Sequence, residues 1–272
     1  MGLFYNNNVA GPGVSKNGRQ KKPFFRYWEM FANKFWTFFK INLIYFVFCI
    51  PVVTFGPATA AMTALMRNIY LERPQFVLHD FWQAFKKNFK QSFVIGLLDV
   101  WFMVMAVFCF FFFTANMDNN DSPYWLYYAM VLAVEIVILM MNFYIFPQIV
   151  ALNLKLPQIL KNSFILAFLN LKGNLISLAV FLAYLTLVMF CLPVLLLLPL
   201  MPLAWLSFTA MFTSYPAIQK YIINPFYEAQ GLKNPEIPDY DDEEDTIFED
   251  RGGEEAPIKI QKQDKRGGKV IK

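Results

Sequence analysis

Long apolar runs separated by short polar segments dominate the first 227 residues of the chain. Two of these runs, Ser92 to Ala115 and Tyr124 to Pro147, each hold about 24 residues, enough for a helix to cross a hydrocarbon core of about 30 Å. The segment between them, NMDNNDSP, is short and polar. The pattern therefore predicts a helical hairpin in a membrane.

A second hairpin is predicted between Gly173 and Gln219, a run that contains no charged residue. As a single helix this run would be roughly 70 Å long, more than twice the thickness of the bilayer core. Proline removes a backbone donor and clashes with the preceding turn, so Pro193, Pro199 and Pro202 mark the place where the chain folds back. We expect the tip of this hairpin near Leu198 to Pro202.

The run from Ile41 to Met66 admits one tilted helix or a hairpin, since roughly 39 Å of helix could cross the bilayer once. Pro51, Gly56 and Pro57 interrupt the run, and Pro57 is suited to the first turn of a new helix. A hairpin also leaves all 24 Lys and Arg on one side of the membrane, which the positive-inside bias identifies as the cytoplasm. Because each limb is short, this hairpin either crosses fully or re-enters.

We therefore expect an all-α, polytopic membrane protein with about six spans in three hairpins, linked by cytoplasmic amphipathic helices. Residues 1–23 form a polar, basic cytoplasmic segment, residues 24–227 the membrane domain, and residues 228–272 a charged cytoplasmic tail with the composition of a disordered segment. Composition agrees, because 57% of the residues are hydrophobic and only 16% are charged. Soluble proteins hold about 45 to 50% apolar residues.

Two amphipathic segments are predicted to lie in the cytoplasmic interface with their basic side chains toward anionic head groups. In the first, QFVLHDFWQAFKKNFK, aromatic side chains recur at helical spacing and the lysines lie largely off that stripe. The second, LPQILKNSFILAFLNLKGN, has Leu160, Phe164 and Phe168 on one face. The expected contact residues of the first segment are Phe81, Trp82, Phe85, Lys86 and Lys87.

The sequence contains no recognisable catalytic or metal-binding set. His79 is the single histidine, which excludes paired-histidine metal sites and HExxH chemistry, and no GxSxG motif occurs. Cys49, Cys109 and Cys191 all lie in apolar runs, where cysteine behaves as a small hydrophobic residue. We expect no catalytic residue, no metal, no cofactor and no nucleic acid; the expected partner is the lipid bilayer.

Two acids lie inside the central hairpin, where a lone charge costs about 2.5 to 3.5 kcal/mol. Asp99 and Glu135 differ in height by only roughly 7 Å, so they could share a cavity with Asn42, Asn142 or Arg67. Two interpretations stay open. The acids form a proton or cation site, or they are buried groups whose interhelical hydrogen bonds fix the packing.

The stretch LIYFVFCIPVVTFGPATAAMTALMRNIY resembles the YesL-like family of bacterial membrane proteins, a domain of unknown function found mainly in Gram-positive bacteria. The resemblance covers about residues 24 to 226 and is carried by Asn42, Leu43, Pro51, Thr54, Gly56, Pro57, Ala58 and the later LKNSFILAFLNLKGNL. It implies a multi-pass protein of the bacterial cell membrane, and it implies little about mechanism because the family has no established activity and no assigned catalytic residues. Genes of such proteins often lie beside those of carbohydrate ABC transporters and two-component sensors.

Two functions therefore remain open at the level of sequence. The first is a non-enzymatic accessory or regulatory protein that contacts an ABC permease or a sensor kinase in carbohydrate uptake or sensing. The alternative is a small secondary transporter that uses Glu135 and Asp99. An intramembrane enzyme is the least favoured class, because the residues that such chemistry needs are missing.

Overall fold

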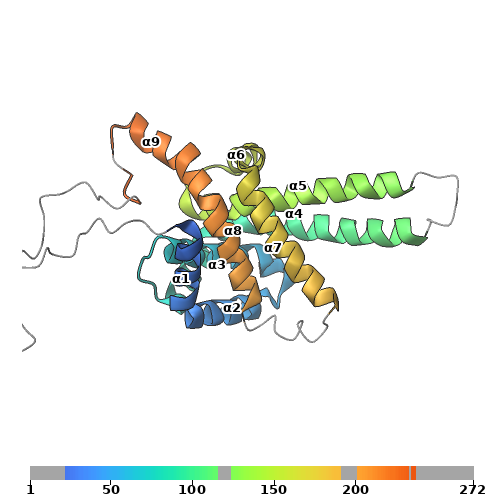
Figure 1. Cartoon of the computed structure of the whole chain (residues 1–272), viewed down its shortest axis with the longest axis horizontal. Helices are drawn as coiled ribbons and strands as arrows, with labels where there is room; N and C mark the ends of the chain where they lie inside the picture. The colour runs from blue at the N-terminus through green and yellow to red at the C-terminus, as the bar shows by residue number, and fades with distance from the viewer. Residues whose placement is uncertain (1–21, 116–123, 191–200, 233, 237–272) are drawn as a thin grey trace, which may run out of the picture. The chain divides into compact units, whose positions relative to one another are not determined.

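The computed structural model describes residues 22–115, 124–190, 201–232 and 234–236, all of which belong to one compact unit, Lys22–Glu236. Within these ranges every regular element is helical, which confirms the all-α prediction (Figure 1). The helices are α1 (Pro23–Asn33), α2 (Phe35–Cys49), α3 (Phe55–Tyr70), α4 (Val77–Ala115), α5 (Tyr124–Ala151), α6 (Leu156–Leu169), α7 (Leu171–Phe190), α8 (Pro202–Ile218) and α9 (Asn224–Ala229). A 3-10 turn, Val52–Thr54, precedes α3, and a π-helical turn, Gln219–Ile223, follows α8.

Three of these helices are long and apolar enough to cross a membrane, in α4, α5 and α7. Their spanning segments are Val77–Ala115, Trp125–Ala151 and Leu171–Val188. Most of their side chains are not buried inside the protein, which is the pattern of helices whose solvent is lipid rather than water. The coarse prediction of a helical membrane protein is thus supported by length and composition.

Helices α4 and α5 lie side by side as an antiparallel pair (Figure 1). Near the free end of the pair the ring of Phe113 stacks on that of Tyr127, with the centroids 6.5 Å apart. The predicted turn between them lies outside the described residues. Helices α7 and α8 also pack together, with a hydrogen bond between the hydroxyls of Ser177 and Thr213. Most of their predicted tip lies outside the described residues, and α8 begins at Pro202.

The break predicted in the first apolar run is present. Helix α2 ends at Cys49, and the chain turns through Pro51 and the 3-10 turn before α3 begins at Phe55. Pro57 lies in the first turn of α3, where backbone N–H groups have no partner within the helix, so its missing donor costs nothing there.

The fold differs from prediction at α4. The amphipathic segment and the apolar run were expected to be separate helices, but Val77–Ala115 is one helix of 39 residues. No proline or glycine occurs between Val77 and Ile95, so nothing in the backbone ends the helix where the composition changes from basic to apolar. The first amphipathic segment is therefore the N-terminal part of α4 rather than an independent helix.

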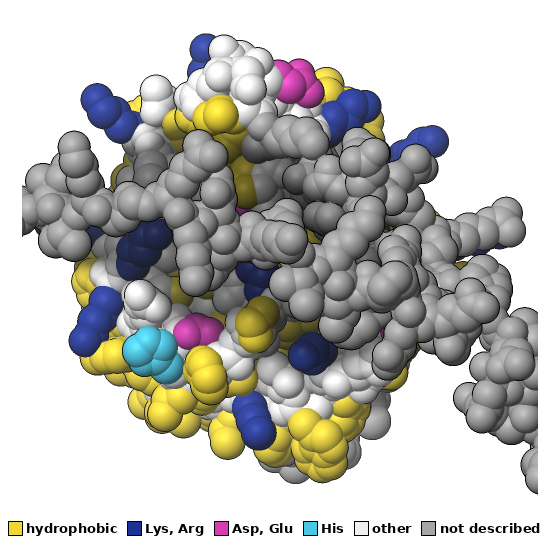
Figure 2. All heavy atoms as spheres, turned by 90° about the vertical axis from the view of Figure 1, so that its left-hand side faces the viewer, with side chains coloured by type: hydrophobic (Ala, Val, Ile, Leu, Met, Phe, Trp, Pro, Cys, Tyr) yellow, Lys and Arg dark blue, Asp and Glu magenta, His cyan; other side chains and the backbone are white. Residues whose placement is uncertain are grey.

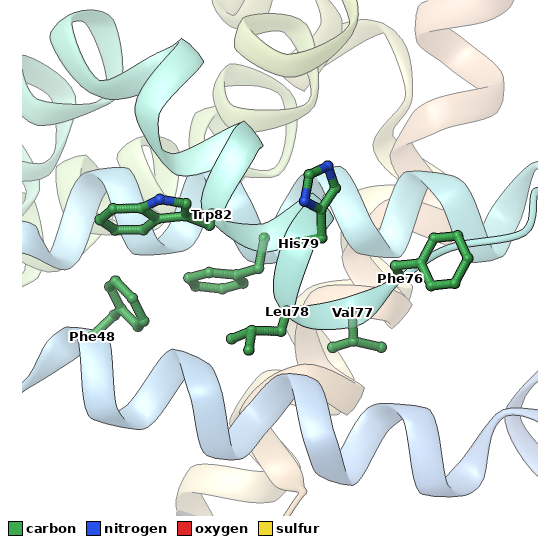
Figure 3. A pocket seen from close by; sticks show the side chains of 7 residues that line it. Phe48, Phe76, Val77, Leu78, His79 and Trp82 are labelled. Atoms are coloured by element: carbon green, nitrogen blue, oxygen red, sulfur yellow. The ribbon is translucent and has the colours of Figure 1, made fainter.

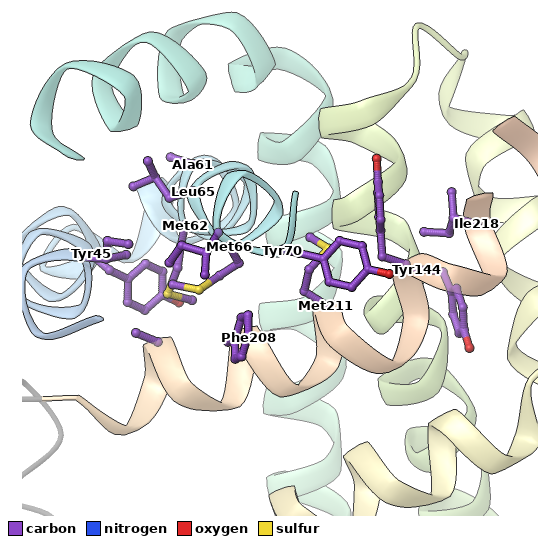
Figure 4. Packing of buried hydrophobic residues seen from close by; sticks show 14 of the residues in the cluster. Tyr45, Ala61, Met62, Leu65, Met66, Tyr70, Tyr144, Phe208, Met211 and Ile218 are labelled. Carbon is purple, nitrogen blue, oxygen red and sulfur yellow. The ribbon is translucent and has the colours of Figure 1, made fainter. Parts of the chain in front are cut away.

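Helix α3 forms the centre of the unit, with 11 of its 16 residues buried. Figure 4 shows Met62 and Met66 of α3 between Tyr45 of α2 and Phe208 of α8, while Leu65 lies on the opposite side of α3 in the same buried cluster. Many of its other buried residues are glycine or alanine, which allow neighbouring helices to approach closely. Helix α3 is thus able to pack against α2, α4, α5 and α8.

Candidate functional site

The family-like motif, which consists of Pro51, Thr54, Gly56 and Pro57, builds the turn between α2 and α3 and the contact of α3 with α4. The hydroxyl of Thr54 donates hydrogen bonds to the carbonyl oxygens of Phe48 and Pro51, the latter over 2.7 Å, and so closes the turn. Gly56 lies directly against Gly96, where an added Cβ on Gly96 would meet the Cα of Gly56 at 2.5 Å. These residues have a structural reason to be small or hydroxylated, independent of any ligand.

Asp99 and Asn142 meet between α4 and α5. The Nδ2 of Asn142 donates a hydrogen bond of 2.8 Å to the Oδ1 of Asp99. The Oδ1 of Asn142 is itself buried without a hydrogen-bond partner among the described residues. Glu135 lies two turns from Asn142 along the same helix and is half-buried. The structure therefore provides a polar spot inside the central hairpin, formed by one carboxylate and one carboxamide in contact.

Asn42 and Arg67 do not join this spot, in contrast to the cavity that the sequence allowed. The Oδ1 of Asn42 accepts a hydrogen bond of 2.8 Å from the backbone N–H of Ala204, at the start of α8. Helix α3 runs antiparallel to the first part of α4, with Gly56 against Gly96. Arg67 therefore lies roughly 16 Å along the α3 axis from Gly56, on the side away from Asp99.

Arg67 belongs to a second polar cluster at the end of α3. Its Nε donates to the hydroxyl oxygen of Tyr215 over 2.6 Å, and its Nη2 forms an ion pair with Glu236. The Tyr215 hydroxyl lies 2.9 Å from Oε2 of Glu236, and the side-chain amide of Gln219 donates to the same oxygen over 3.2 Å. Burial acts to lower the pKa of Arg67, but Tyr215 and Glu236 outweigh it and raise the pKa, so the guanidinium stays charged.

Sequence reasoning missed the partner of Arg67, because Glu236 was assigned to the solvated tail. The described unit in fact continues past the expected boundary at residue 227 through α9 to Glu236. The sequence feature that could have indicated this ion pair is Arg67 itself, a single cation at the end of an apolar run. A buried cation needs a counter-charge, and an acid elsewhere in the chain could supply it.

A third group of buried polar side chains joins α5 to the junction of α6 and α7. The hydroxyl of Tyr144 donates a hydrogen bond of 2.7 Å to Oδ1 of Asn174 and accepts one of 3.1 Å from Asn170. Asn170 also donates to the carbonyl oxygen of Thr213 in α8, over 3.0 Å. Asn170 and Asn174 of the LKNSFILAFLNLKGNL stretch therefore serve to connect helices.

The predicted contact residues of the first amphipathic segment divide between the core and the surface. Phe81 and Phe85 are buried against Phe48 of α2, with ring centroids 5.2 Å apart in both pairs, so they belong to the core rather than to the exposed face of the helix. Helix α2 covers this face because the α2–α3 pair packs on the N-terminal part of α4. Trp82, Lys86 and Lys87 are exposed, as expected, and the Nζ of Lys86 lies 4.6 Å from the centre of the Trp82 ring.

An open apolar groove of about 780 Å³ lies beside this exposed strip (Figure 3). The N-terminal part of α4 forms most of it, and α2 contributes one aromatic ring. His79 supplies its one imidazole. The lining residues are Phe48, Phe76, Val77, Leu78, His79, Phe81 and Trp82. The groove is thus suited to an apolar side chain or an acyl chain rather than to a polar substrate.

Most of the second amphipathic segment forms α6, which has one buried face and one exposed face. Ile159, Ser163 and Leu166 are buried, and Ser163 accepts a hydrogen bond of 2.9 Å from the buried amide of Gln148. Phe164 and Phe168, which were expected to share a face, are both exposed. The described residues contain no group of three or more His, Cys, Asp and Glu side chains placed to hold a metal ion.

A comparison with protein families agrees with the resemblance of the sequence. The family described as "Protein of unknown function, DUF624", which is the YesL-like family, matches residues 30–113. This range covers α2, α3, the Thr54 turn, the Gly56–Gly96 contact and nearly all of α4. No curated protein and no solved structure matches the sequence. Residues 30–113 of the chain are therefore similar to the YesL-like family, whose description assigns no function.

Proposed function

We propose that this chain is a non-enzymatic accessory or regulatory membrane protein that acts by contact with a partner protein. The observation that carries the proposal is the continuity of α4. One helix of 39 residues, roughly 58 Å long, joins the basic segment that precedes the bilayer to the apolar segment that crosses it. A contact at one end of such a helix is transmitted to the other end, because no hinge interrupts it.

The cytoplasmic contact surface is the exposed strip of α4 beside the apolar groove. Phe76, Leu78 and Trp82 are exposed there, next to Lys86 and Lys87. Aromatic and apolar side chains bordered by cations are typical of surfaces that bind an amphipathic helix or an acidic segment of another protein. An ABC permease or a sensor kinase of carbohydrate uptake is the partner that the family resemblance favours.

The proposed arrangement in the bacterial cell membrane has both termini in the cytoplasm. Figure 2 supports it, because Lys and Arg side chains are spread over the face that carries His79 and the start of α4. Helices α2 and α3 measure roughly 22 Å and 24 Å, less than the bilayer core of about 30 Å. Their turn also packs near Gly96, early in the apolar part of α4. Both features favour a first hairpin that re-enters instead of crossing.

Photo-crosslinking in native membranes tests the partner contact. A photo-reactive phenylalanine analogue replaces Trp82, and Trp36 in α2, whose exposed fraction is 72%, serves as the matched control position. We expect a reproducible protein adduct from position 82 and none from position 36. Adducts with lipid alone, or the same proteins at both positions, contradict the proposal.

A small secondary transporter is the second candidate, and the Asp99–Asn142 contact favours it. The pair lies between two spanning helices and leaves one buried oxygen of Asn142 without a partner among the described residues. Buried ionisable groups within spans are common in proton and cation pathways. If the protein is a transporter, the flux of protons or cations into proteoliposomes falls in Asp99→Asn and Glu135→Gln variants that remain folded. Unchanged flux in both removes this candidate.

A further inference from the structure

The end of the described chain returns to the helical unit and places one carboxylate on a group of buried donors. We propose that Arg67, Tyr215 and Gln219 form a carboxylate-binding site whose occupant is the chain's own Glu236, and that this contact latches the start of the C-terminal segment onto the ends of α3 and α8.

The donors converge from separate elements. Arg67 belongs to α3, Tyr215 to α8 and Gln219 to the π-helical turn that follows α8. The side chains of Arg67 and Glu236 are only 15% and 8% exposed, and Tyr215 is fully buried. Both oxygens of Glu236 are engaged, one by Arg67 and Tyr215 and the other by Tyr215 and Gln219. A buried carboxylate is stable when a cation and further donors satisfy it in this way.

The π-helical turn is the second feature of the site. Pro216 lies inside α8 and removes one backbone donor, and the helix widens to the π form at Gln219. A π turn shifts the side chains that follow it around the helix axis. Here it begins at the residue whose amide reaches Glu236. Single π turns within α-helices occur often at functional sites.

The segment that carries Glu236 is fixed by contacts of its own. The Oδ1 of Asn234 accepts a hydrogen bond of 2.9 Å from the backbone N–H of Glu236, an Asx turn that aims the carboxylate. The side-chain amide of Asn234 donates to Asn224, at the start of α9, over 2.8 Å. Asn234 is nearly buried despite its position close to the end of the described residues. The sequence Asn-Pro-Glu is therefore shaped to present an acid to Arg67.

Release of the latch leaves Arg67 charged and without its counter-charge, which is unfavourable for a buried cation. The state in which Glu236 occupies the site is therefore lower in free energy than the empty state. The residues that follow Glu236 in the sequence are Ile-Pro-Asp-Tyr-Asp-Asp. The latch therefore fixes the residue that directly precedes this segment. The latch is independent of the partner contact proposed above, because its residues come from α3, α8, the π turn and the chain end, and none from α4. A negative result for the partner contact therefore does not contradict the latch, and a negative result for the latch does not contradict the partner contact.

Hydrogen exchange of the full chain in lipid nanodiscs tests the latch. Glu236→Gln removes the charge, and Glu228→Gln makes the same change at an exposed position of α9. We expect the backbone amides of Leu232, Asn234 and Glu236 to exchange about tenfold faster in Glu236→Gln, with α4 unchanged, while Glu228→Gln matches the unmodified protein. Equal exchange in all three proteins overturns the latch.

A second variant and a second lipid separate the latch from binding of an external anion. Arg67→Gln should release the same segment, and the double variant Arg67→Gln/Glu236→Gln should exchange no faster than either single variant, because both remove one contact. We expect protection of Leu232, Asn234 and Glu236 in nanodiscs of phosphatidylcholine and also with added phosphatidylglycerol. Protection that disappears in the anionic lipid means that a head-group phosphate takes Arg67, and this contradicts a site built for Glu236.

Discussion

At the scale of single residues, the contact of Gly56 with Gly96 explains why the motif of the first hairpin needs small residues. A Cβ on Gly56 would overlap the carbonyl oxygen of Ser92, and a Cβ on Gly96 would meet the backbone of Gly56. Backbone atoms cannot move aside as a flexible side chain can. The two helices can therefore keep their separation only with glycine at both positions.

Gly56→Ala should weaken the protein although alanine is the better helix former. We expect the free energy of unfolding in mixed micelles to fall by about 1 to 3 kcal/mol, because the added methyl group forces α3 and α4 apart. Val104→Ile adds a methylene at an exposed site of α4 and is expected to change little. Equal stability of Gly56→Ala and the unmodified protein would show that α3 and α4 do not pack this closely.

The hydroxyl of Tyr144 supports a second residue-scale prediction. Tyr144→Phe keeps the ring but leaves Oδ1 of the buried Asn174 without its donor. The expected loss in the free energy of unfolding is about 1 kcal/mol. Tyr127→Phe, at a residue that is 49% exposed, is the control and should have no measurable effect. If the two variants unfold alike, the hydrogen bonds between α5 and α7 contribute nothing to stability.

At the scale of elements, the apolar runs and the prolines allowed more to be predicted than the polar residues did. Pro51 indicated the break between α2 and α3, and the two long runs indicated α4 and α5. The location of Arg67 could not be predicted, because it depends on which helix α3 packs against and in which direction. The same holds for Glu236, which lies just before a strongly acidic stretch of the sequence while its partners lie on α3 and α8.

Helix α4 is the element on which prediction and structure differ most. A change from basic to apolar composition at Gln91 was interpreted as the end of one helix and the start of another. Composition, however, sets the environment of a helix, and only backbone chemistry ends it. Phe81 and Phe85 were likewise expected at the membrane surface, but α2 covers them, a contact that periodicity alone cannot reveal.

Distance measurement between two spin labels tests the continuity of α4. Labels at Leu78 and Val104, both exposed, should lie about 39 Å apart along one straight helix. A segment that lay flat on the membrane and turned into the span near Ser92 would bring them to about 28 Å. A narrow distribution near the longer distance is expected in nanodiscs. A dominant population near the shorter one would restore two separate helices.

At the scale of the whole molecule, lipid is the solvent that explains the fold. The spanning helices expose most of their apolar side chains, and the unit has no other element among its described residues to cover them. Lys and Arg side chains are spread over the face that carries His79, and the polar clusters lie inside the helical unit. A helical membrane protein of this kind needs a hydrocarbon layer. The positive-inside bias predicts that its cationic face lies in the cytoplasm.

Labelling of single cysteines in intact cells tests this account most directly. In a variant without Cys49, Cys109 and Cys191, one cysteine is introduced in place of Lys87 or of Asn119, in the segment between α4 and α5. A membrane-impermeant maleimide should label position 119 from outside and position 87 only after the membrane is opened. Labelling of position 87 in sealed cells, or recovery of the protein without detergent, would contradict the account.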